Sequence, residues 1–346
     1  MANAPATPLP RPNCYCPTYH IVGFFIPIVL IQSGKLDYEA KMDYNFYTAD
    51  VFTDRLFGGN PLAVFPNATG LDTDMMQMIA REFNLSETIF FFPPDDPQNT
   101  VKARIFTPGR ELPFAGHPTV GGSFMLATLG LIKLDGSVTE IVCEELVGPV
   151  PVKIFADENG NVIKTELSAA KMPEFIDATP SADVIADVLS LESEDILNGR
   201  LSPEVVTAGV PFLFVPVKDR DALARSVVDV AQWRKHLADS VAKDMFLFCF
   251  DPEREGSNVR ARMYAPSMGI TEDPATGAAA TAFAGYLAKR ADQKNGTLRW
   301  VMEQGFEMGR PSILEIETDV KNGVSQAIRV GGSSVMVSQG TFTLPD

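Results

Sequence analysis

Residues 104–121 read RIFTPGRELPFAGHPTVG, and a related stretch at residues 262–277 reads RMYAPSMGITEDPATG. Both open on an arginine, an aromatic residue two positions later and a proline two positions after that, at 104–108 and 262–266. In each copy a second element follows, HPTVG at 117–121 and DPATG at 273–277, and then a run of small and apolar residues typical of a buried helix, at 121–129 and 277–288. The ordered match predicts a duplicated α/β unit, which usually places its site where the two copies meet.

The residues around these two stretches predict short strands alternating with helices. Alternating or continuous apolar runs indicate strands at 45–51, 62–65, 87–92, 102–106, 139–143 and 150–155, with a turn at 57–61. Asp72 is expected to cap a helix that runs to Arg81. We expect four apolar residues of that helix to pack in the core: Met75, Met76, Met78 and Ile79.

The length and charge of the chain limit its domains and partners. With 346 residues, two domains are expected. The 29 basic and 44 acidic residues give a net charge of −15, which repels phosphate backbones and anionic headgroups. We therefore expect neither nucleic acid nor a membrane as partner. A small anionic carboxylate substrate stays possible, because the backbone amides of a pocket can outweigh the overall field.

Cysteine and histidine usage predicts a cytoplasmic protein without a histidine-based metal site. No two cysteines have the spacing of a zinc or C-x-x-C redox site, so we interpret them as reduced thiols, two of them (Cys143 and Cys249) in buried strands. The full set is Cys14, Cys16, Cys143 and Cys249. The three histidines are too far apart in sequence to indicate a metal site: His20, His117 and His236.

The first 41 residues differ from the rest of the chain. They are rich in proline and alanine and then contain an apolar run at 21–31, shorter than the roughly 20 residues that span a bilayer. A signal sequence is an alternative, but no convincing cleavage site follows. We expect a poorly ordered N-terminal extension at 1–41, or sequence upstream of a start at Met42. The expected domains are 42–168 and 175–332, and the last strand, at about 333–346, packs back onto the first domain.

Glu87 is the first candidate for acid/base chemistry, because it begins a strongly aromatic strand. Desolvation by neighbouring aromatic rings raises the pKa of a carboxyl group toward the range useful for proton transfer. The rings expected there are Phe83, Phe90, Phe91 and Phe92. The plainer interpretation is a carboxylate that faces solvent or pairs with Arg81.

His117 and Asp273 are the next candidates, because each lies where a helix is expected to begin. Free amides and the helix dipole favour an anion at such a place. The plainer interpretation is structural: His117 would be a cap or a core hydrogen-bonding residue, Asp273 an N-cap and Pro274 the first helical residue. If the two copies face each other, His117 and Asp273 meet across the pseudo-twofold axis and two helix N-termini point into one pocket.

Taken together, these motifs resemble those of the PhzF-like proteins of phenazine biosynthesis. The matching segments occur in order from residue 44 onward: YTADVF at 47–52, FGGNPLAV at 57–64, NLSET at 84–88, RIFTP at 104–108, GH at 116–117 and EDPATG at 272–277. The resemblance implies an α+β fold of two similar diaminopimelate-epimerase-like domains, each a β-sheet rolled around a central helix and related by a pseudo-twofold axis. It also implies a homodimer. The family's acid/base glutamate falls on Glu87, and its supporting residues fall on His117 and Asp273.

Two departures from related sequences bear on the substrate. Ala115 stands where epimerases of this fold carry a catalytic cysteine before the glycine, and the second cysteine position falls in 273–277, which contains none. A two-cysteine amino-acid epimerase is therefore disfavoured. Ala278 stands where the family commonly has serine, which removes one hydroxyl contact and argues against carrying over the phenazine-precursor substrate.

The hypothesis from the sequence is a cofactor-free isomerase that moves a proton between carbons of a small carboxylate substrate. Glu87 takes the proton and returns it on the same face, while His117 and Asp273 orient the substrate. Amides at the two helix starts stabilise the charge of a dienolate. A diverged binding or interaction protein of the same fold is the alternative. The candidate substrate-binding residues are Asn60, Ser86, Gly116, Thr276, Gly277 and Ala278.

Overall fold

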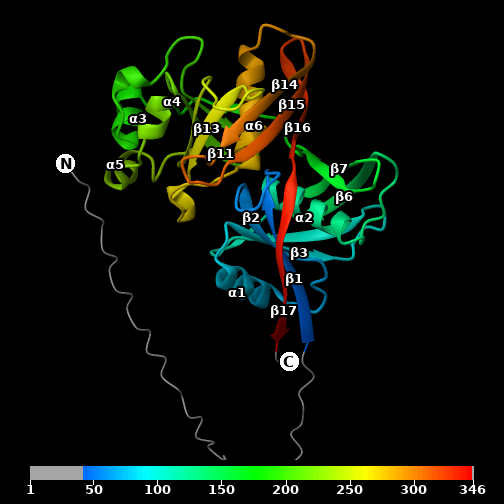
Figure 1. Cartoon of the computed structure of the whole chain (residues 1–346). Helices are drawn as coiled ribbons and strands as arrows, with labels where there is room; N and C mark the ends of the chain where they lie inside the picture. The colour runs from blue at the N-terminus through cyan, green and yellow to red at the C-terminus, as the bar shows by residue number, and fades with distance from the viewer. Residues whose placement is uncertain (1–41, 345–346) are drawn as a thin grey trace, which may run out of the picture.

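The computed structural model describes residues 42–344. The predicted N-terminal extension, with Cys14, Cys16 and His20, lies outside these residues. Within 42–344, no helix has the length and apolar character needed to cross a membrane. Figure 1 shows two lobes joined at a waist, with the strands β1 and β17, at the two ends of the described chain, side by side in the lower lobe.

Each lobe contains its own helices and a share of the seventeen strands. The lower lobe holds β1 (Met42–Val51), β2 (Asn60–Phe65), α1 (Thr73–Phe83), β3 (Glu87–Phe92), β4 (Val101–Phe106), β5 (Glu111–Leu112), α2 (Gly116–Thr128), β6 (Val138–Glu145), β7 (Gly148–Ala156), β8 (Val162–Ser168) and β17 (Ser334–Leu344). The upper lobe holds β9 (Glu174–Ile176), α3 (Ala182–Leu189), β10 (Glu204–Thr207), β11 (Pro211–Pro216), α4 (Arg220–Arg225), α5 (Val230–His236), β12 (Asp244–Cys249), β13 (Val259–Tyr264), α6 (Gly277–Arg290), β14 (Gly296–Gln304), β15 (Ser312–Lys321) and β16 (Val324–Gly332).

The two lobes pair their strands in the same way. In the lower lobe β17 and β1 are antiparallel, β2 and β3 parallel, β3 and β4 antiparallel, β4 and β6 parallel, and β6, β7 and β8 successively antiparallel. The upper lobe repeats these directions with β9 and β10, β11 and β12, β12 and β13, β13 and β14, and then β15 and β16. The structure is thus duplicated, as the repeat predicted, and has the α+β fold that the resemblance implied.

A buried helix lies at the centre of each rolled sheet. All residues of α2 from Gly116 to Ala127 are buried, and in α6 Gly277 and every residue from Ala279 to Ala288 are buried. A helix surrounded by protein needs apolar or small side chains on all its faces, and the small residues of both helices meet that need. The apolar core is continuous from α2 to α6, which fixes the two helix starts relative to each other.

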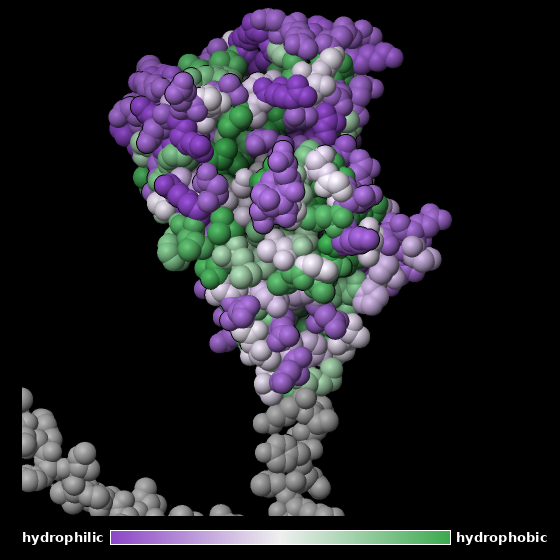
Figure 2. Space-filling model, turned by 45° about the vertical axis from the view of Figure 1, so that its right-hand side comes forward, coloured by the Kyte–Doolittle hydropathy of each residue, from purple (hydrophilic) through white to green (hydrophobic). Residues whose placement is uncertain are grey.

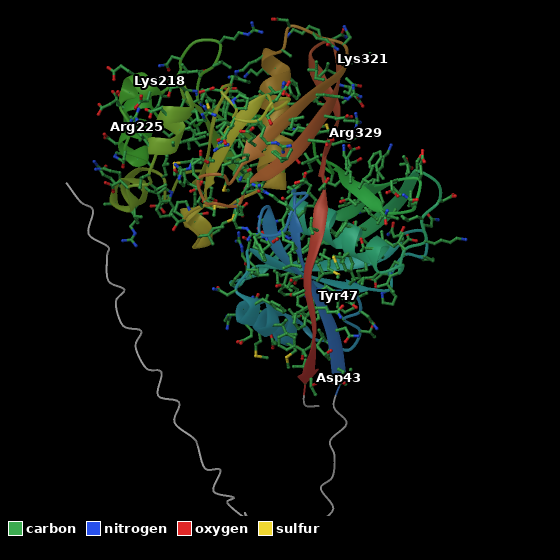
Figure 3. The ribbon with its side chains drawn as sticks, viewed as in Figure 1. Asp43, Tyr47, Lys218, Arg225, Lys321 and Arg329 are labelled. Atoms are coloured by element: carbon green, nitrogen blue, oxygen red, sulfur yellow. The ribbon has the colours of Figure 1, made fainter. Side chains whose placement is uncertain are left out.

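The chain crosses between the lobes twice, and the two crossings lie side by side. β8 ends the lower lobe and pairs antiparallel with the end of β16, from Arg329 opposite Ser168 to Gly332 opposite Thr165. In Figure 3 the labelled Arg329 lies just above the waist, with Tyr47 in the lower lobe and Lys218 at the far side of the upper lobe. Figure 2 shows hydrophobic residues gathered around the middle of the molecule, below a largely hydrophilic upper end.

Most of the predicted elements agree with the structure, with one core residue misassigned. Asp72 caps α1 by accepting a hydrogen bond from the backbone of Met75, and Met76 and Ile79 are buried. Met78, however, is 52% exposed, because it lies on the solvent face of the amphipathic helix. Cys143 and Cys249 are buried in β6 and β12, as predicted.

Candidate active site

The two copies of the repeat that organises the site align at different residues from those predicted. Arg104 forms a two-pronged ion pair with Glu111, at 2.6 and 2.7 Å, and Arg262 forms the same pair with Glu272, at 2.9 and 2.8 Å. From each glutamate the chain reads E-x-P-x-x-G and enters the central helix at the glycine.

The predicted match of 117–121 with 273–277 is therefore wrong. Because α2 begins at Gly116, segment 111–116 corresponds to 272–277 and His117 corresponds to Ala278. The predicted N-cap role of Asp273 is also wrong. The N-cap of α6 is Thr276, and Asp273 lies three residues before it in a bridge with Met263.

The two helix starts touch at their glycines. A Cβ atom placed on Gly116 would lie 2.8 Å from the Cα of Gly277, and one on Gly277 would lie 2.9 Å from the Cα of Gly116. Any side chain at either position would push the helices apart. Neither helix start has a side-chain cap hydrogen bond, so both N-termini leave amides free beside this contact.

A cavity of about 330 Å³ lies in front of the paired helix starts. Gly116, Gly277 and Thr276 are in its inner wall, and Glu87, His117 and Asp273 line it as well. The remaining wall is largely apolar. Its side chains include Leu112, Phe114, Val210, Phe212, Met263 and Ile270. The geometry suits a small molecule with an anionic end at the amides and an apolar body.

Glu87 is buried in this cavity, and both plainer interpretations of it are wrong. Its side chain is 15% exposed, and its Oε2 lies 3.2 Å from Nδ1 of His117. Arg81 instead points its Nε toward the carbonyl of Pro108. Burial raises the pKa of Glu87 well above its usual value, and the nearby Asp273 raises it further.

The aromatic residues around Glu87 are not the predicted ones. Phe83 and Phe90 belong to a separate cluster, packed with Phe65. The rings that line the cavity with Glu87 are Phe114 and Phe212. They come from the loop before α2 and from the upper lobe, where neighbourhood in the sequence could not place them.

Asn60 connects the site residues behind the cavity wall. Its side-chain amide donates to Oδ1 of Asp273 and to the carbonyl of Ala275, both at 2.9 Å, and lies 3.3 Å from Nδ1 of His117. Asn60 and Ser86, expected among the substrate-binding residues, are absent from the described cavity lining. Ser86 donates toward Asp273 at 3.4 Å, so both polar groups hold that carboxylate in place.

The protonation states follow from burial. Burial lowers the pKa of His117 to about 3, so its ring is neutral near pH 7. Burial raises the pKa of Asp273 to about 6, although hydrogen bonds from Thr276, Asn60 and Ser86 oppose the increase. Among the described residues, Oε2 of Glu87 and Nε2 of His117 are buried polar atoms without a hydrogen-bond partner. Such atoms are costly to leave unpaired, so they are available for a ligand.

The strand registers identify the position in the upper lobe that corresponds to Glu87. β3 pairs with β4 in the same register relative to Arg104 as β12 pairs with β13 relative to Arg262. Glu87 therefore corresponds to Asp244, the first residue of β12. Asp244 is buried, but it does not line the described cavity, and its carboxylate accepts from the backbone and the hydroxyl of Ser267.

The other site residues correspond to apolar residues in the opposite lobe. β2 lies beside β3, and β11 beside β12, in the same parallel register, so Asn60 corresponds to Val210. Both residues precede a proline, and this G-x-P repeat at 59–61 and 209–211 is the sequence signal that could have identified Val210. Asp273 corresponds to Leu112. Val210, Leu112 and Ala278 all line the cavity, so the counterparts of the polar site residues form an apolar part of its lining, next to the charged Arg110 and Glu111.

Within residues 42–344, no group of three or more His, Cys, Asp or Glu side chains is placed to hold a metal ion. The carboxylates and the histidine of the cavity are held instead by one another and by Asn60. What the arrangement offers chemically is a buried carboxyl with a raised pKa, a neutral imidazole and two sets of free amides.

Comparison with known proteins places this geometry among related sequences. Residues 49–340 match the family model of the phenazine biosynthesis-like proteins. The chain is 37% identical to an uncharacterized isomerase of Mesorhizobium japonicum, over 86% of this chain and 97% of that one. It is 32% identical to a trans-2,3-dihydro-3-hydroxyanthranilate isomerase of Pseudomonas fluorescens, over 87% and 100%. The crystal structure of a Bacillus anthracis PhzF-family phenazine biosynthesis protein is similar at a TM-score of 0.78, with 25% identity over 88% and 100%.

Proposed function

The chain belongs to the phenazine biosynthesis-like, or PhzF-like, family of isomerases, and on that premise we propose that it moves a proton between two carbons of a small carboxylate substrate with Glu87 as its only acid and base. The observation that carries the proposal is the Oε2 atom of Glu87. It is buried at the cavity, has no hydrogen-bond partner among the described residues and belongs to a carboxyl group whose pKa is raised. A general acid/base needs such a group near neutral pKa and open to the substrate.

The proton transfer is balanced within the substrate. The Glu87 carboxylate removes a proton from one carbon, the electron pair of that C–H bond moves into the conjugated system, and the protonated carboxyl then delivers the proton to a second carbon. No redox partner is needed, because substrate and product contain the same atoms and electrons. The substrate carboxylate lies at the amides of Gly116, Gly277 and Ala278, which stabilise the negative charge of the intermediate.

His117 and Asp273 orient the substrate. A neutral His117 with its Nδ1 beside Glu87 leaves Nε2 free for a polar group of the substrate. Asp273 is held by Asn60 and by Thr276, so its carboxylate keeps one orientation. It also supplies a negative charge that raises the pKa of Glu87 and so favours the return of the proton.

The residues that line the cavity favour proton transfer on a single face of the substrate. A two-base epimerase needs a second proton carrier, and Leu112, Val210 and Ala278, the counterparts of the polar site residues, carry none. Glu111 also lines the cavity, but both of its carboxylate oxygens accept from Arg104. Ala115 and Thr276 precede the two helix glycines, so neither position offers a thiol. These residues support an isomerisation in which Glu87 removes and returns the proton on the same side.

The test is the Glu87→Gln variant, which keeps the shape of the side chain and removes the titrating group. Deuterium incorporation from D₂O, measured by mass spectrometry, is followed over a panel of aminated cyclohexadiene acids that includes trans-2,3-dihydro-3-hydroxyanthranilate. We expect Glu87→Gln to lower the exchange rate of any turned-over acid by roughly 10²- to 10⁴-fold.

Asp244→Asn is the matched control, because it makes the same kind of change at the corresponding position of the upper lobe, outside the cavity. This variant should keep exchange within a few-fold of the native rate, and thermal melting checks that both variants are folded. If Glu87→Gln retains full exchange, or if Asp244→Asn loses as much, the assignment of Glu87 is wrong.

A further inference from the structure

The apolar wall of the cavity borders a second cavity of about 320 Å³. Four residues line both spaces: Pro113, Phe114, Val210 and Ala278. They come from both lobes, since the first two precede α2, Val210 ends the turn between β10 and β11, and Ala278 is the second residue of α6. The second cavity therefore lies directly behind the wall that faces Glu87.

The lining of the second cavity is chemically different from the catalytic side. Most of its residues are small and apolar, including Val147, Ala169, Ala170 and Ala208. Lys171 is the only charged residue in the described lining. The space can therefore hold an apolar group and offers little to a polar one.

The duplicated fold explains why this side is open. His117, the counterpart of Ala278, places an imidazole at the start of its helix, where Ala278 offers only a methyl group. Val210 is 38% exposed, whereas its counterpart Asn60 is fully buried. The positions that hold Asp273 and Glu87 on the polar side are thus small or loosely packed on the apolar side. Phe114, which is only partly buried, lines both cavities next to Val210.

We propose that the two cavities form one substrate site, in which the carboxylate end lies at the helix N-termini and an apolar substituent extends past Ala278, between Phe114 and Val210, into the second cavity. This inference rests on the proposed function, because that function places the carboxylate. It specifies the substrate class as an acid with an apolar extension longer than a single ring. The first cavity, at about 330 Å³, is near the lower end of the range for ligand sites and accommodates the reacting part alone.

The experiment uses a ladder of probe acids, from phenylacetate through 3-phenylpropanoate to 6-phenylhexanoate, with binding to the full chain measured by calorimetry. We expect the dissociation constant to fall by roughly tenfold or more at the length where the ring reaches the second cavity, because a buried ring removes a large apolar area from water. Filling the passage in Ala278→Leu should abolish this step. If Ala278→Leu folds poorly, Ala170→Leu replaces it as the test. Ala170→Leu narrows only the second cavity and should also abolish the fall in dissociation constant.

Gly109→Ala is the control, because Gly109 is in neither cavity lining and a Cβ atom there would have no neighbour within 4 Å other than the hydroxyl of Thr107, at 3.9 Å. This variant should retain the fall in dissociation constant with increasing probe length. The inference is overturned if affinity does not change with the chain length of the probe acid, or if the fall in dissociation constant survives both Ala278→Leu and Ala170→Leu. In either case, binding of phenylacetate would still support the carboxylate site. If no probe binds, or if binding of phenylacetate is unaffected by an added side chain in Gly116→Ala, the carboxylate site of the proposed function fails and the inference fails with it.

Discussion

The two lobes have kept the same framework and differ in four positions that decide the chemistry. Both use the same strand directions, a buried central helix and an arginine–glutamate pair ahead of that helix. The lower lobe, however, contributes Glu87 and His117 to the cavity and Asn60 behind its wall, where the corresponding residues of the upper lobe are Asp244, Ala278 and Val210. The fold therefore depends on features that the lobes share, and the site depends on where they differ.

Asp273 is the exception that makes the site bipartite. It is the one polar group of the four supplied by the upper lobe, and its counterpart in the lower lobe is Leu112. Asn60 joins it to the lower lobe at 2.9 Å, so the polar wall forms only when the lobes are docked. Because the lobes meet at Gly116 and Gly277, their docking geometry and the placement of Glu87 beside Asp273 are fixed together.

Among the features that both lobes share, we expect the two arginines to differ most in their contribution to the free energy of unfolding. Arg262 is 8% exposed and donates to the carbonyls of Leu223, Ala224 and Ser226 as well as to Glu272. Removing one partner of a buried pair leaves an uncompensated charge, so Arg262→Met should lower the free energy of unfolding by about 3–5 kcal/mol. Urea denaturation measures this loss.

Arg104→Met is the matched change in the lower lobe and should cost about 1 kcal/mol, because both side chains of the Arg104–Glu111 pair are 21% exposed. Combining Arg262→Met with Glu272→Leu should recover much of the larger loss, since no buried charge then stays unpaired. Equal losses for the two arginines would mean that the lobes use this pair in the same way despite its different burial.

A smaller and symmetric effect is expected at the helix glycines. Gly116→Ala and Gly277→Ala should each lower the free energy of unfolding by about 2 kcal/mol, because each new methyl group meets the backbone of the other helix. Alanine favours helix more than glycine does, so a loss cannot come from helix propensity. The double variant should cost less than the two single losses together, because the first substitution already separates the helices.

Gly109→Ala is the control for the glycine pair, because a Cβ atom there has only one neighbour, at 3.9 Å. It should leave the unfolding curve within about 0.5 kcal/mol of the native one. Losses that simply add in the double variant would show that the two glycines are not in contact in solution.

Much of this framework could be predicted from the sequence, because it depends on local patterns. The apolar runs gave the strands around Glu87 and Arg104, and the repeated arginine motif gave the duplication. The alignment of the two helix starts was harder to predict from the sequence. HPTVG and DPATG look alike as sequence, but the phase is set by Glu111 and Glu272, whose role appears only when each pairs with its arginine in space.

The apolar wall could not be predicted for a related reason. Phe114 and Phe212 are ordinary loop and core residues in the sequence, and no local pattern distinguishes them; for Val210 the only signal is the G-x-P repeat. They become cavity residues because the rolled sheets of two lobes meet there. Glu87 is predicted from its strand, but the rings that line the cavity with it, Phe114 and Phe212, are distant from it in the sequence.

A last pair of corresponding positions supports the helix starts from behind. The parallel register of β4 with β6, and of β13 with β14, matches Glu145 with Gln304. Gln304 donates to the carbonyl of Asp273 and accepts from the backbone of Thr276. Glu145 lies 2.6 Å from the hydroxyl of Thr119, which also lies 2.7 Å from the carbonyl of Ala115. The Thr119 hydroxyl donates toward both of these oxygens, and burial raises the pKa of Glu145 to about 8, so near pH 7 this buried carboxyl is mainly neutral, like the amide of Gln304.

The smallest predicted effect tests this equivalence through pH. Burial raises the pKa of Glu145 to about 8, whereas the unfolded chain ionises near its usual value of about 4.3. Between these values the folded protein holds one more proton, so this group's stabilisation is fully present below about pH 4 and is lost as pH rises through 8. Glu145→Gln keeps an oxygen that accepts from the Thr119 hydroxyl and does not titrate. Urea curves of the variant and the native protein should therefore diverge by about 1 kcal/mol between pH 5 and pH 6, with the variant gaining relative stability. Because Glu87 and Asp273 titrate in both proteins, their contributions cancel in the difference. A difference that is constant with pH would mean that Glu145 is ionised in the folded state and that its resemblance to Gln304 is one of shape alone.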